Sequence, residues 1–215
     1  MPLLGAIFDL DGVIVDTAKY HYLAWKRLAQ ELGFVFTEKD NERLKGVSRM
    51  ASLDILLEVG GISMTPEQKE AAAARKNAWY VDYIRQIDKS ELLPGAREYL
   101  LWLRERGVRT ALGSASKNAG IILENTGIQS LFDAVVDGGH VSRAKPDPEV
   151  FLLAAARLHL NPPQCAVFED AAAGVQAALA GGMTAVGVGD PLVLARAHRV
   201  IPGLNYADSI RDLWE

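Results

Sequence analysis

Residues 5–13 read Gly-Ala-Ile-Phe-Asp-Leu-Asp-Gly-Val (GAIFDLDGV), and this stretch decides the fold. Its first part, residues 5–10, is apolar except at Asp9, which is typical of a strand in a parallel sheet with both faces covered. Further short apolar runs occupy residues 108–112, 134–137, 165–168 and 184–188. We expect all five segments to be strands of one sheet.

Helical segments are expected between most of these strands. Residues 94–106 and 117–126 are followed by Gly107 and Gly127, the residue type that most often ends a helix in a left-handed conformation. Asp147 is expected to cap a further helix, with Pro148 in its first turn. Strands and helices that alternate at this spacing predict a doubly wound, Rossmann-like parallel α/β domain.

One long segment interrupts this alternation. Residues 16–92 contain no convincing strand, and their capping signals and apolar spacing predict helices over 17–32, over 48–58 and from Thr65 to about Ile87. We therefore expect a helical bundle inserted after the first strand as a cap over the sheet. The predicted division is an α/β catalytic core of residues 1–15 and 93–215 and a helical cap of residues 16–92.

Composition excludes several classes of protein. The 215 residues are 49% hydrophobic and 23% charged with a net charge of −4, so the chain is neither disordered nor of low complexity. Its single cysteine cannot form an internal disulfide, and no apolar run reaches the ~18–20 residues of a membrane span. The N-terminus lacks the basic region of a secretory signal, and no block of basic residues favours nucleic acid. We expect a cytoplasmic monomer that contacts neither membrane nor nucleic acid.

Polar side chains follow the carboxyl ends of the expected strands, where ligands of open α/β sheets bind. Asp9 and Asp11 end the first strand, and residues 113–116 (GSAS) follow the second. Lys145 comes after the third strand, and Glu169 and Asp170 end the fourth. The sequence therefore predicts that these groups meet at one edge of the sheet.

These residue types together indicate phosphoryl transfer. Clustered carboxylates repel one another unless a cation offsets them, and an all-oxygen ligand set suits Mg²⁺. A turn containing Ser114 and Ser116 offers backbone N–H groups to an anion, and Lys145 adds a positive charge. Positioning and charge neutralisation are the main requirements of this reaction. Asp9 can act as the nucleophile, and Asp11, two residues along an extended chain, can act beside it as acid and base.

Each feature alone also has an ordinary explanation. An Asp-x-Asp pair is usually a solvated turn, a Gly-Ser-Ala-Ser segment or a Glu-Asp pair is usually a helix cap, and Lys-Pro is usually a surface turn. The joint placement of these features on successive strand ends favours the functional interpretation.

Four segments resemble, in order, the motifs of the haloacid dehalogenase superfamily: residues 9–13 (DLDGV), 113–114 (GS), 145–148 (KPDP) and 169–170 (ED). The resemblance implies that Asp9 is a nucleophile that forms an aspartyl phosphate and that Asp11 is the general acid/base. Ser114, Ala115 and Lys145 would bind the transferring phosphate. The implied Mg²⁺ ligands are Asp9, the Asp11 backbone carbonyl, Glu169 and Asp170. Asp11 argues against dehalogenation, which needs no proton donor, and the helical insertion resembles the subgroup with an α-helical cap.

Residues 17–21, 44–49, 75–77 and 114–118 further resemble the phosphomutases of this superfamily that interconvert β-D-glucose 1-phosphate and D-glucose 6-phosphate through a bound 1,6-bisphosphate. The resemblance implies that the distal phosphate and the sugar are bound by Gly46, Val47, Ser48, Arg49, Ser116, Lys117, Asn118, His21, Lys76 and Trp25, with Thr17 in the hinge of the cap. A mutase needs this second set because its intermediate has a phosphate at each end. Arg49 suits the binding of the distal phosphate, since a guanidinium can bind a phosphate in bidentate fashion.

Alternatives remain open at this point. Taken alone, Arg49 is an ordinary solvated or salt-bridged residue, Lys76 a surface charge and His21 a packing residue. The chain could be a phosphatase of the same superfamily that acts on a sugar phosphate or on phosphoglycolate, or a phospho-accepting signalling domain. A catalytically inactive phosphate-binding protein is disfavoured because no motif residue is missing. Ala171 stands where many relatives carry a hydroxyl, and we expect a looser contact beside the metal there.

Overall fold

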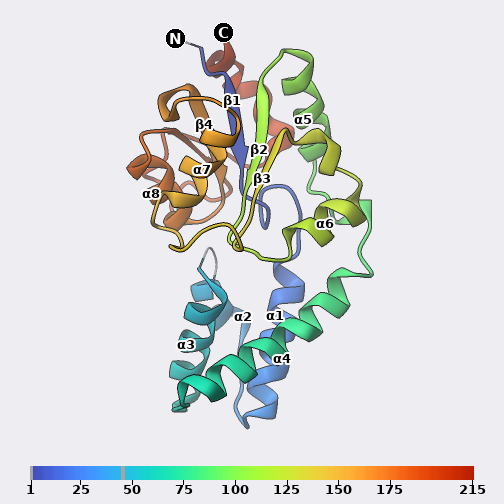
Figure 1. Cartoon of the computed structure of the whole chain (residues 1–215), viewed down its shortest axis with the longest axis vertical. Helices are drawn as coiled ribbons and strands as arrows, with labels where there is room; N and C mark the ends of the chain where they lie inside the picture. Colours follow the sequence, from blue (N-terminus) through green and yellow to red (C-terminus); the bar gives the residue numbers. More distant parts are fainter. Residues whose placement is uncertain (1, 45–46) are drawn as a thin grey trace.

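A computed structural model describes residues 2–44 and 47–215, and its centre is a six-stranded parallel sheet (Figure 1). The order is β3-β2-β1-β4-β5-β6, so β1 is central, and the chain runs outward from it first to one side and then to the other. This is the doubly wound arrangement, with its switch point between β1 and β4. The strands are β1 (Gly5–Phe8), β2 (Arg109–Gly113), β3 (Ala134–Val136), β4 (Cys165–Glu169), β5 (Thr184–Val188) and β6 (Arg199–Ile201).

Helices cover both faces of the sheet, as the apolar strands require. Because neighbouring residues of a strand point to opposite faces, Ile7 and Val167 pack on one side, whereas Phe8 and Phe168 pack on the other. Ile7 and Val167 share a core with α7 (Glu149–Arg157) and α8 (Ala172–Ala180), and Phe8 and Phe168 share one with α5 (Ala96–Glu105), α6 (Ala119–Thr126) and the 3₁₀ segment η5 (Leu204–Trp214). Two short 3₁₀ turns, η3 (Gln129–Leu131) and η4 (Pro162–Gln164), precede β3 and β4.

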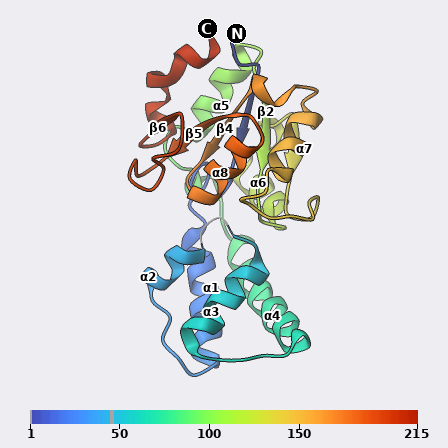
Figure 2. The ribbon, with the colours of Figure 1, turned by 90° about the vertical axis from the view of Figure 1, so that its left-hand side faces the viewer.

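A second group of helices lies between β1 and β2 in the sequence and gathers beyond the carboxyl edge of the sheet (Figures 1 and 2). It has its own apolar core, in which Trp25, Leu28, Phe36, Leu53 and Leu56 are buried. Its elements are α1 (Ala18–Glu31), α2 (Glu38–Asn41), η1 (Glu42–Leu44), α3 (Arg49–Gly60) and α4 (Pro66–Ile84), and η2 (Lys89–Glu91) leads back to the sheet. We call α1–α4 the cap.

The two chain segments that enter and leave the cap run side by side. Val15 forms an antiparallel bridge with Leu92. The Asp16 backbone N–H donates to the Glu91 carbonyl at 3.0 Å, and that of Leu93 donates to the Ile14 carbonyl at 2.9 Å. The cap is therefore joined to the sheet through one paired crossing rather than through two separate points.

Several predicted boundaries shift for local reasons. The first strand ends at Phe8 rather than Leu10, because the Leu10 carbonyl accepts hydrogen bonds from the Ile14 and Val15 N–H groups and turns the chain. The Ser116 hydroxyl accepts from the Asn118 N–H, so residues 117 and 118 belong to a turn and α6 starts at Ala119.

Other boundaries differ by a few residues. Asp147 accepts from the Glu149 N–H but is not the cap residue, which is Pro148. The helix expected over 94–106 is α5, which starts at Ala96, and the one expected to reach Ile87 ends at Ile84. Ser48 and Thr65 cap α3 and α4 as predicted. Strand β6 and helix α2 were not expected.

No helix within residues 2–44 and 47–215 combines the length and the apolar content that a membrane span requires.

Candidate active site

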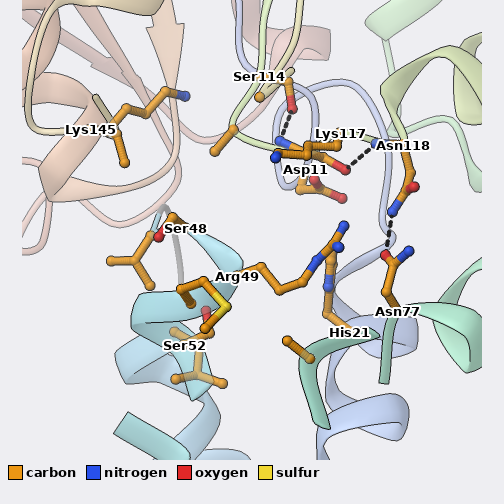
Figure 3. A pocket seen from close by; sticks show the side chains of 18 of the residues that line it. Asp11, His21, Ser48, Arg49, Ser52, Asn77, Ser114, Lys117, Asn118 and Lys145 are labelled. Atoms are coloured by element: carbon orange, nitrogen blue, oxygen red, sulfur yellow. Dashed lines mark hydrogen bonds between the residues drawn. The ribbon is translucent and has the colours of Figure 1, made fainter. Parts of the chain in front are cut away.

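A cavity of about 490 Å³ lies between the cap and the carboxyl edge of the sheet (Figure 3). Core and cap both contribute to its wall. The core supplies Asp9, Asp11, Asp170, Lys145 and residues 114–118, and the cap supplies His21, Trp25, Val47, Ser48, Arg49, Ser52, Lys76 and Asn77. The strand ends thus converge here, as parallel strands require.

Lys145 is held between two carboxylates at the floor of the cavity. Its Nζ donates to Asp9 Oδ1 at 2.6 Å and also to Glu169 Oε1, and its side chain is 1% exposed. Burial alone lowers the pKa of Lys145, but the charges of Asp9 and Glu169 outweigh it and raise the pKa above its ordinary value. Lys145 therefore stays charged beside the candidate nucleophile, where it can neutralise a phosphoryl oxygen.

Three acids form a group suited to a metal ion. Asp9, Glu169 and Asp170 each offer an oxygen, and these oxygens lie within 4.8 Å of one another. Burial is the main influence on the pKa of Glu169 and raises it, while Lys145 acts in the opposite direction. Three carboxylates and one lysine leave an excess of negative charge. Hard oxygen donors with such an excess fit a divalent cation such as Mg²⁺.

Two glycines make room for these carboxylates. A Cβ on Gly174, in α8, would lie 1.9 Å from the carboxyl carbon of Glu169. A Cβ on Gly12 would lie 2.1 Å from Asp170 Oδ2, and Gly12 also has a φ of +82°, which side-chain-bearing residues rarely adopt. The acid group is thus packed around positions where only glycine fits.

Asp11 lies beside this group in a different environment. Burial raises its pKa to about 7, and the Asp9 charge adds to the effect. Its Oδ1 is buried and, among the described residues, has no hydrogen-bond partner. A carboxyl group with such a pKa can both give and accept a proton near neutral pH.

The segment after β2 forms a turn with inward-facing polar groups. The Ser114 N–H donates to the Val136 carbonyl at 3.0 Å, which fixes the turn to β3. The Ser114 hydroxyl accepts from the Ser116 N–H at 3.1 Å (Figure 3). Ala115 lies between these residues and also lines the cavity.

On the cap side, the buried Lys76 pairs with the half-buried His21. The Lys76 Nζ and the His21 Nδ1 lie 2.9 Å apart, and Nζ also lies 4.4 Å from the centre of the Trp25 ring. Burial is the main cause that lowers the pKa of Lys76 to about 7, with Arg49 next. Burial also lowers the pKa of His21 well below its ordinary value, so the imidazole is neutral. Lys76 is 2% exposed, and the interpretation as a surface charge is wrong.

Arg49, Lys76 and Lys117 all line the cavity, and within the described ranges none of them has a carboxylate at ion-pair distance. Arg49 extends from the start of α3 toward the loop that carries Lys117 (Figure 3). Across the same gap, the Asn118 amide donates to Asn77 Oδ1 at 2.9 Å. Unpaired positive charge in a partly buried cavity favours an anionic ligand.

The remaining predicted site residues lie as follows. Val47 and Ser48 line the cap wall, and Trp25 is buried in the cap core beside Lys76. Thr17 is buried directly before α1 and is not one of the residues that line the cavity. Gly46 lies outside the described residues.

Sequence reasoning missed several residues at this site. Ser52 and Asn77 face the cavity (Figure 3), and Arg143 also lines it. A polar residue one helical turn after Arg49, and another directly after Lys76, could have indicated Ser52 and Asn77.

Comparison with known proteins defines the class of this protein. Residues 4–182 match the model of the haloacid dehalogenase-like hydrolases, and the chain belongs to this family.

Individual relatives within this family give a more specific comparison than the family model. The chain is 43% identical to the β-phosphoglucomutase of Bacillus subtilis over 199 residues, which cover 92% of this chain and 88% of that protein. It is 36% identical to a fructose-1-phosphate phosphatase of Escherichia coli, over 86% of this chain and 95% of the relative. The crystal structure of a β-phosphoglucomutase from Clostridium difficile superposes with a TM-score of 0.94 at 41% identity, covering 99% of this chain and 97% of that one.

Proposed function

We propose that this protein is a Mg²⁺-dependent phosphomutase that interconverts β-D-glucose 1-phosphate and D-glucose 6-phosphate. The reaction runs through β-glucose 1,6-bisphosphate and an aspartyl phosphate on Asp9. Similarity to two β-phosphoglucomutases over nearly the whole chain supports this substrate. The cap and the core of one chain together line the cavity, so a single chain can form the site, and we propose a monomer as the active form.

One observation carries the proposal: positively charged side chains line the cavity in two places, and we propose that each place binds an anion. The first lies at Lys145, Asp9 and Ser114 on the floor, where the nucleophile is. The second lies at Arg49 and Lys117, which also line the cavity and, among the described residues, have no carboxylate at ion-pair distance. A bisphosphate needs a reactive site for one phosphate and a passive site for the other, whereas a phosphatase for monophosphates needs only the first.

The chain's own residues divide the chemistry between them. An Asp9 oxygen attacks the phosphorus of one phosphate group, and the bond from phosphorus to the sugar oxygen breaks. Asp11 donates a proton to that leaving oxygen, which its raised pKa allows near neutral pH. In the return step Asp11 takes the proton of a sugar hydroxyl while that oxygen bonds to phosphorus and the bond to Asp9 breaks.

Asp9, the Asp11 carbonyl, Glu169 and Asp170 are the proposed metal ligands. When bound, Mg²⁺ offsets the carboxylate charges so that a phosphate anion can approach Asp9. Lys145 adds the second positive charge, and its bond to Asp9 orients the carboxylate for attack.

The cap has two proposed roles in this scheme. Arg49, with Ser116, Lys117 and Asn118 of the core, binds the phosphate that does not react, while His21, Lys76, Trp25 and residues 46–48 contact the sugar. Closure of the cap about Thr17 excludes water, which would otherwise hydrolyse the aspartyl phosphate. The proposed cap is residues 16–92, inserted into a core of residues 1–15 and 93–215.

A bisphosphate-primed assay tests the proposal. The protein is incubated with β-D-glucose 1-phosphate, Mg²⁺ and a trace of β-glucose 1,6-bisphosphate, and both glucose 6-phosphate and inorganic phosphate are measured. A mutase makes glucose 6-phosphate without proportional phosphate. The α anomer and the Asp9→Asn variant serve as controls, and neither should give product.

A phosphatase acting on sugar phosphates is the second candidate, because one relative of 36% identity is a fructose-1-phosphate phosphatase. If the protein is such a phosphatase, the same assay should release as much inorganic phosphate as substrate is consumed. A phospho-accepting signalling domain is disfavoured by membership in a hydrolase family and by the cap residues that line the cavity.

A further inference from the structure

Gly138 makes a close contact with the turn of residues 114–118. It is the second residue after β3, and it lines the cavity. A Cβ on Gly138 would lie 2.2 Å from the carbonyl oxygen of Ala115 and 3.0 Å from the carbonyl carbon, and it would lie 3.3 Å from Lys117 Cγ. The shortest of these distances is far below an ordinary contact between carbon and oxygen. Only a residue without a side chain fits between the loop and the turn.

Backbone conformation does not explain the glycine at this position. The φ of Gly138 lies outside the left-handed region, in contrast to that of Gly12. Left-handed backbone strain, the usual reason for a glycine in a turn, is therefore absent at residue 138. The space occupied by the Ala115 carbonyl and the Lys117 side chain accounts for the glycine instead.

Hydrogen bonds hold both sides of this contact. The Gly138 N–H donates to the Ser116 carbonyl at 3.4 Å, which joins the loop to the turn. In the loop, the Asp137 carboxylate accepts from the Gly139 N–H at 2.8 Å. In the turn, the Ser116 N–H donates to the Ser114 hydroxyl, and the Ser114 N–H donates to β3. Because both sides are tied to β3, neither can retreat from an added methyl group without disturbing the other.

The turn that Gly138 contacts contributes to both proposed anion places. Ser114 and Ala115 belong to the place beside Asp9, and Lys117 belongs to the place at Arg49. Ala115 has no polar side chain, so it can bind a phosphate only through its backbone N–H. The direction of that N–H depends on the course of the turn, which the contact with the loop limits.

We propose that Gly138 is a positioning residue for the phosphate-binding turn, and this inference rests on the proposed function of the turn. Its missing side chain lets the Ala115 carbonyl lie against the loop after β3. This contact sets where Ser114 and Ala115 stand relative to Asp9. Relief of a 2.2 Å contact requires a shift of roughly 1 Å, and a misplacement of this size can lower a rate by about 100-fold.

The test compares Gly138→Ala with Gly139→Ala. Both changes add one methyl group to the same loop, and the φ of Gly139 also lies outside the left-handed region. Gly139 does not line the cavity. Among the described residues other than its chain neighbours, the one heavy atom within 4 Å of its added Cβ is Asp137 Oδ1, at 3.1 Å. Gly139→Ala is therefore the matched control.

Three quantities are measured in each protein. The first is the rate of aspartyl phosphate formation from acetyl phosphate, in which an Asp9 oxygen bonds to phosphorus and acetate leaves. The second is kcat/KM for glucose 6-phosphate formation. The third is the Kd for Mg²⁺, which reports on the fold of the acid group and not on the turn.

We expect Gly138→Ala to slow aspartyl phosphate formation by roughly tenfold and to lower kcat/KM for glucose 6-phosphate formation by roughly 100-fold, because the second reaction uses both anion places. The Kd for Mg²⁺ should keep its wild-type value, since Asp9, Glu169 and Asp170 follow or end β1 and β4 rather than β3. Gly139→Ala should match the wild type in all three measurements.

Wild-type rates in Gly138→Ala would overturn the inference. An equal loss of activity in Gly139→Ala would also overturn it, since a general disturbance of the loop would then explain both results. A parallel loss of Mg²⁺ binding in Gly138→Ala would overturn it as well, because the change would not be confined to the turn. Failure of the proposed mutase function is visible separately, since the wild type would release phosphate in proportion to the substrate consumed.

Discussion

At the scale of single residues, the site contains charges that the ligand-free protein does not neutralise. Lys76 is buried against His21 and the Trp25 ring and, in the part of the chain that the structure describes, has no carboxylate partner. A buried unpaired charge lowers stability. We infer that the protein tolerates this cost because an anionic ligand supplies the missing partner.

Replacing Lys76 by Met should therefore stabilise the ligand-free protein while removing activity. Folded Lys76 releases its proton near pH 7, because burial and Arg49 outweigh the opposing effect of Asp11, whereas the unfolded residue holds its proton up to about 10.5. Between about pH 7 and pH 10.5 the unfolded state binds more protons than the folded state, so the free energy of unfolding of the wild type rises with pH over this range. The gain in stability that Lys76→Met gives over the wild type should be largest below pH 7 and should shrink toward pH 10.

Thermal unfolding at several pH values measures this effect. At pH 6 we expect a rise in Tm of at least roughly 2–4 °C, which corresponds to about 1 kcal/mol for a chain of this size. The neighbouring charged and titratable groups, His21, Arg49 and Asp11, are the same in both proteins, so the difference reports on Lys76. A lower Tm for Lys76→Met at every pH would contradict the account.

Sequence reasoning was most reliable for residues that follow strands. Asp9, Ser114 and Glu169 could be placed together because parallel strands of one sheet end at the same edge. In the structure Asp9 and Ser114 line the cavity, and Glu169 lies beneath its floor against Lys145. Lys76 could not be assigned to the interior in this way. Helical spacing shows which residues share a face, but only the packing of α4 against α1 determines that this face is buried.

At the scale of elements, helix α8 and strand β4 hold the acid group through close packing. Gly174 of α8 lies directly against the Glu169 carboxylate at the end of β4. Helix propensity alone would favour alanine at position 174. We infer that glycine stands there because the carboxylate needs the space.

Gly174→Ala should weaken Mg²⁺ binding, because its Cβ would displace Glu169 from Lys145 and Asp170. We expect at least a roughly tenfold rise in Kd, measured by isothermal titration calorimetry with MgCl₂. The control is Gly120→Ala in α6, where no neighbouring atom lies within 4 Å of the added Cβ. Equal Kd values for the two variants would show that Glu169 does not depend on this packing.

Helix α3 places Arg49 at its first position, after the Ser48 cap, so the guanidinium extends toward the core (Figure 3). Arg49→Ala should reduce mutase turnover by roughly 100-fold, since a phosphate contact from a guanidinium is strong. Aspartyl phosphate formation from acetyl phosphate should be nearly unchanged. Arg75→Ala is the matched control, because Arg75 is an exposed arginine of the cap that pairs with Glu31 at 3.3 Å. If Arg49→Ala slows both reactions equally, the assignment to the distal phosphate is wrong.

Most elements could be predicted, and the exceptions have physical reasons. The central strands β1 and β4 are apolar except for Glu169 at the end of β4, because helices cover them on both sides, and this makes them easy to identify. Strand β6 has three residues, begins with an exposed arginine and lies at the sheet edge, so its pattern is weak. Helix α2 has only four residues, fewer than apolar periodicity can reveal.

At the scale of the whole molecule, the cap and the core are joined through one paired crossing at Val15 and Leu92. A ligand that spans both parts should draw them together. Asp9→Asn with β-glucose 1,6-bisphosphate and Mg²⁺ should therefore have a smaller radius of gyration in small-angle X-ray scattering than the same protein without ligand. Inorganic phosphate at equal concentration should have no such effect, because it cannot reach both anion sites. Compaction by phosphate alone would contradict the two-site account.

The most direct measurement follows the phosphoryl group itself. The protein is mixed with ³²P-labelled β-glucose 1,6-bisphosphate and Mg²⁺, the label on the protein is measured after rapid quenching, and unlabelled β-D-glucose 1-phosphate is then added as a chase. The account predicts label on the wild type but not on Asp9→Asn, and it predicts that the chase returns the label to sugar bisphosphate and glucose 6-phosphate. Label that leaves the wild type mainly as inorganic phosphate during the chase would contradict the account.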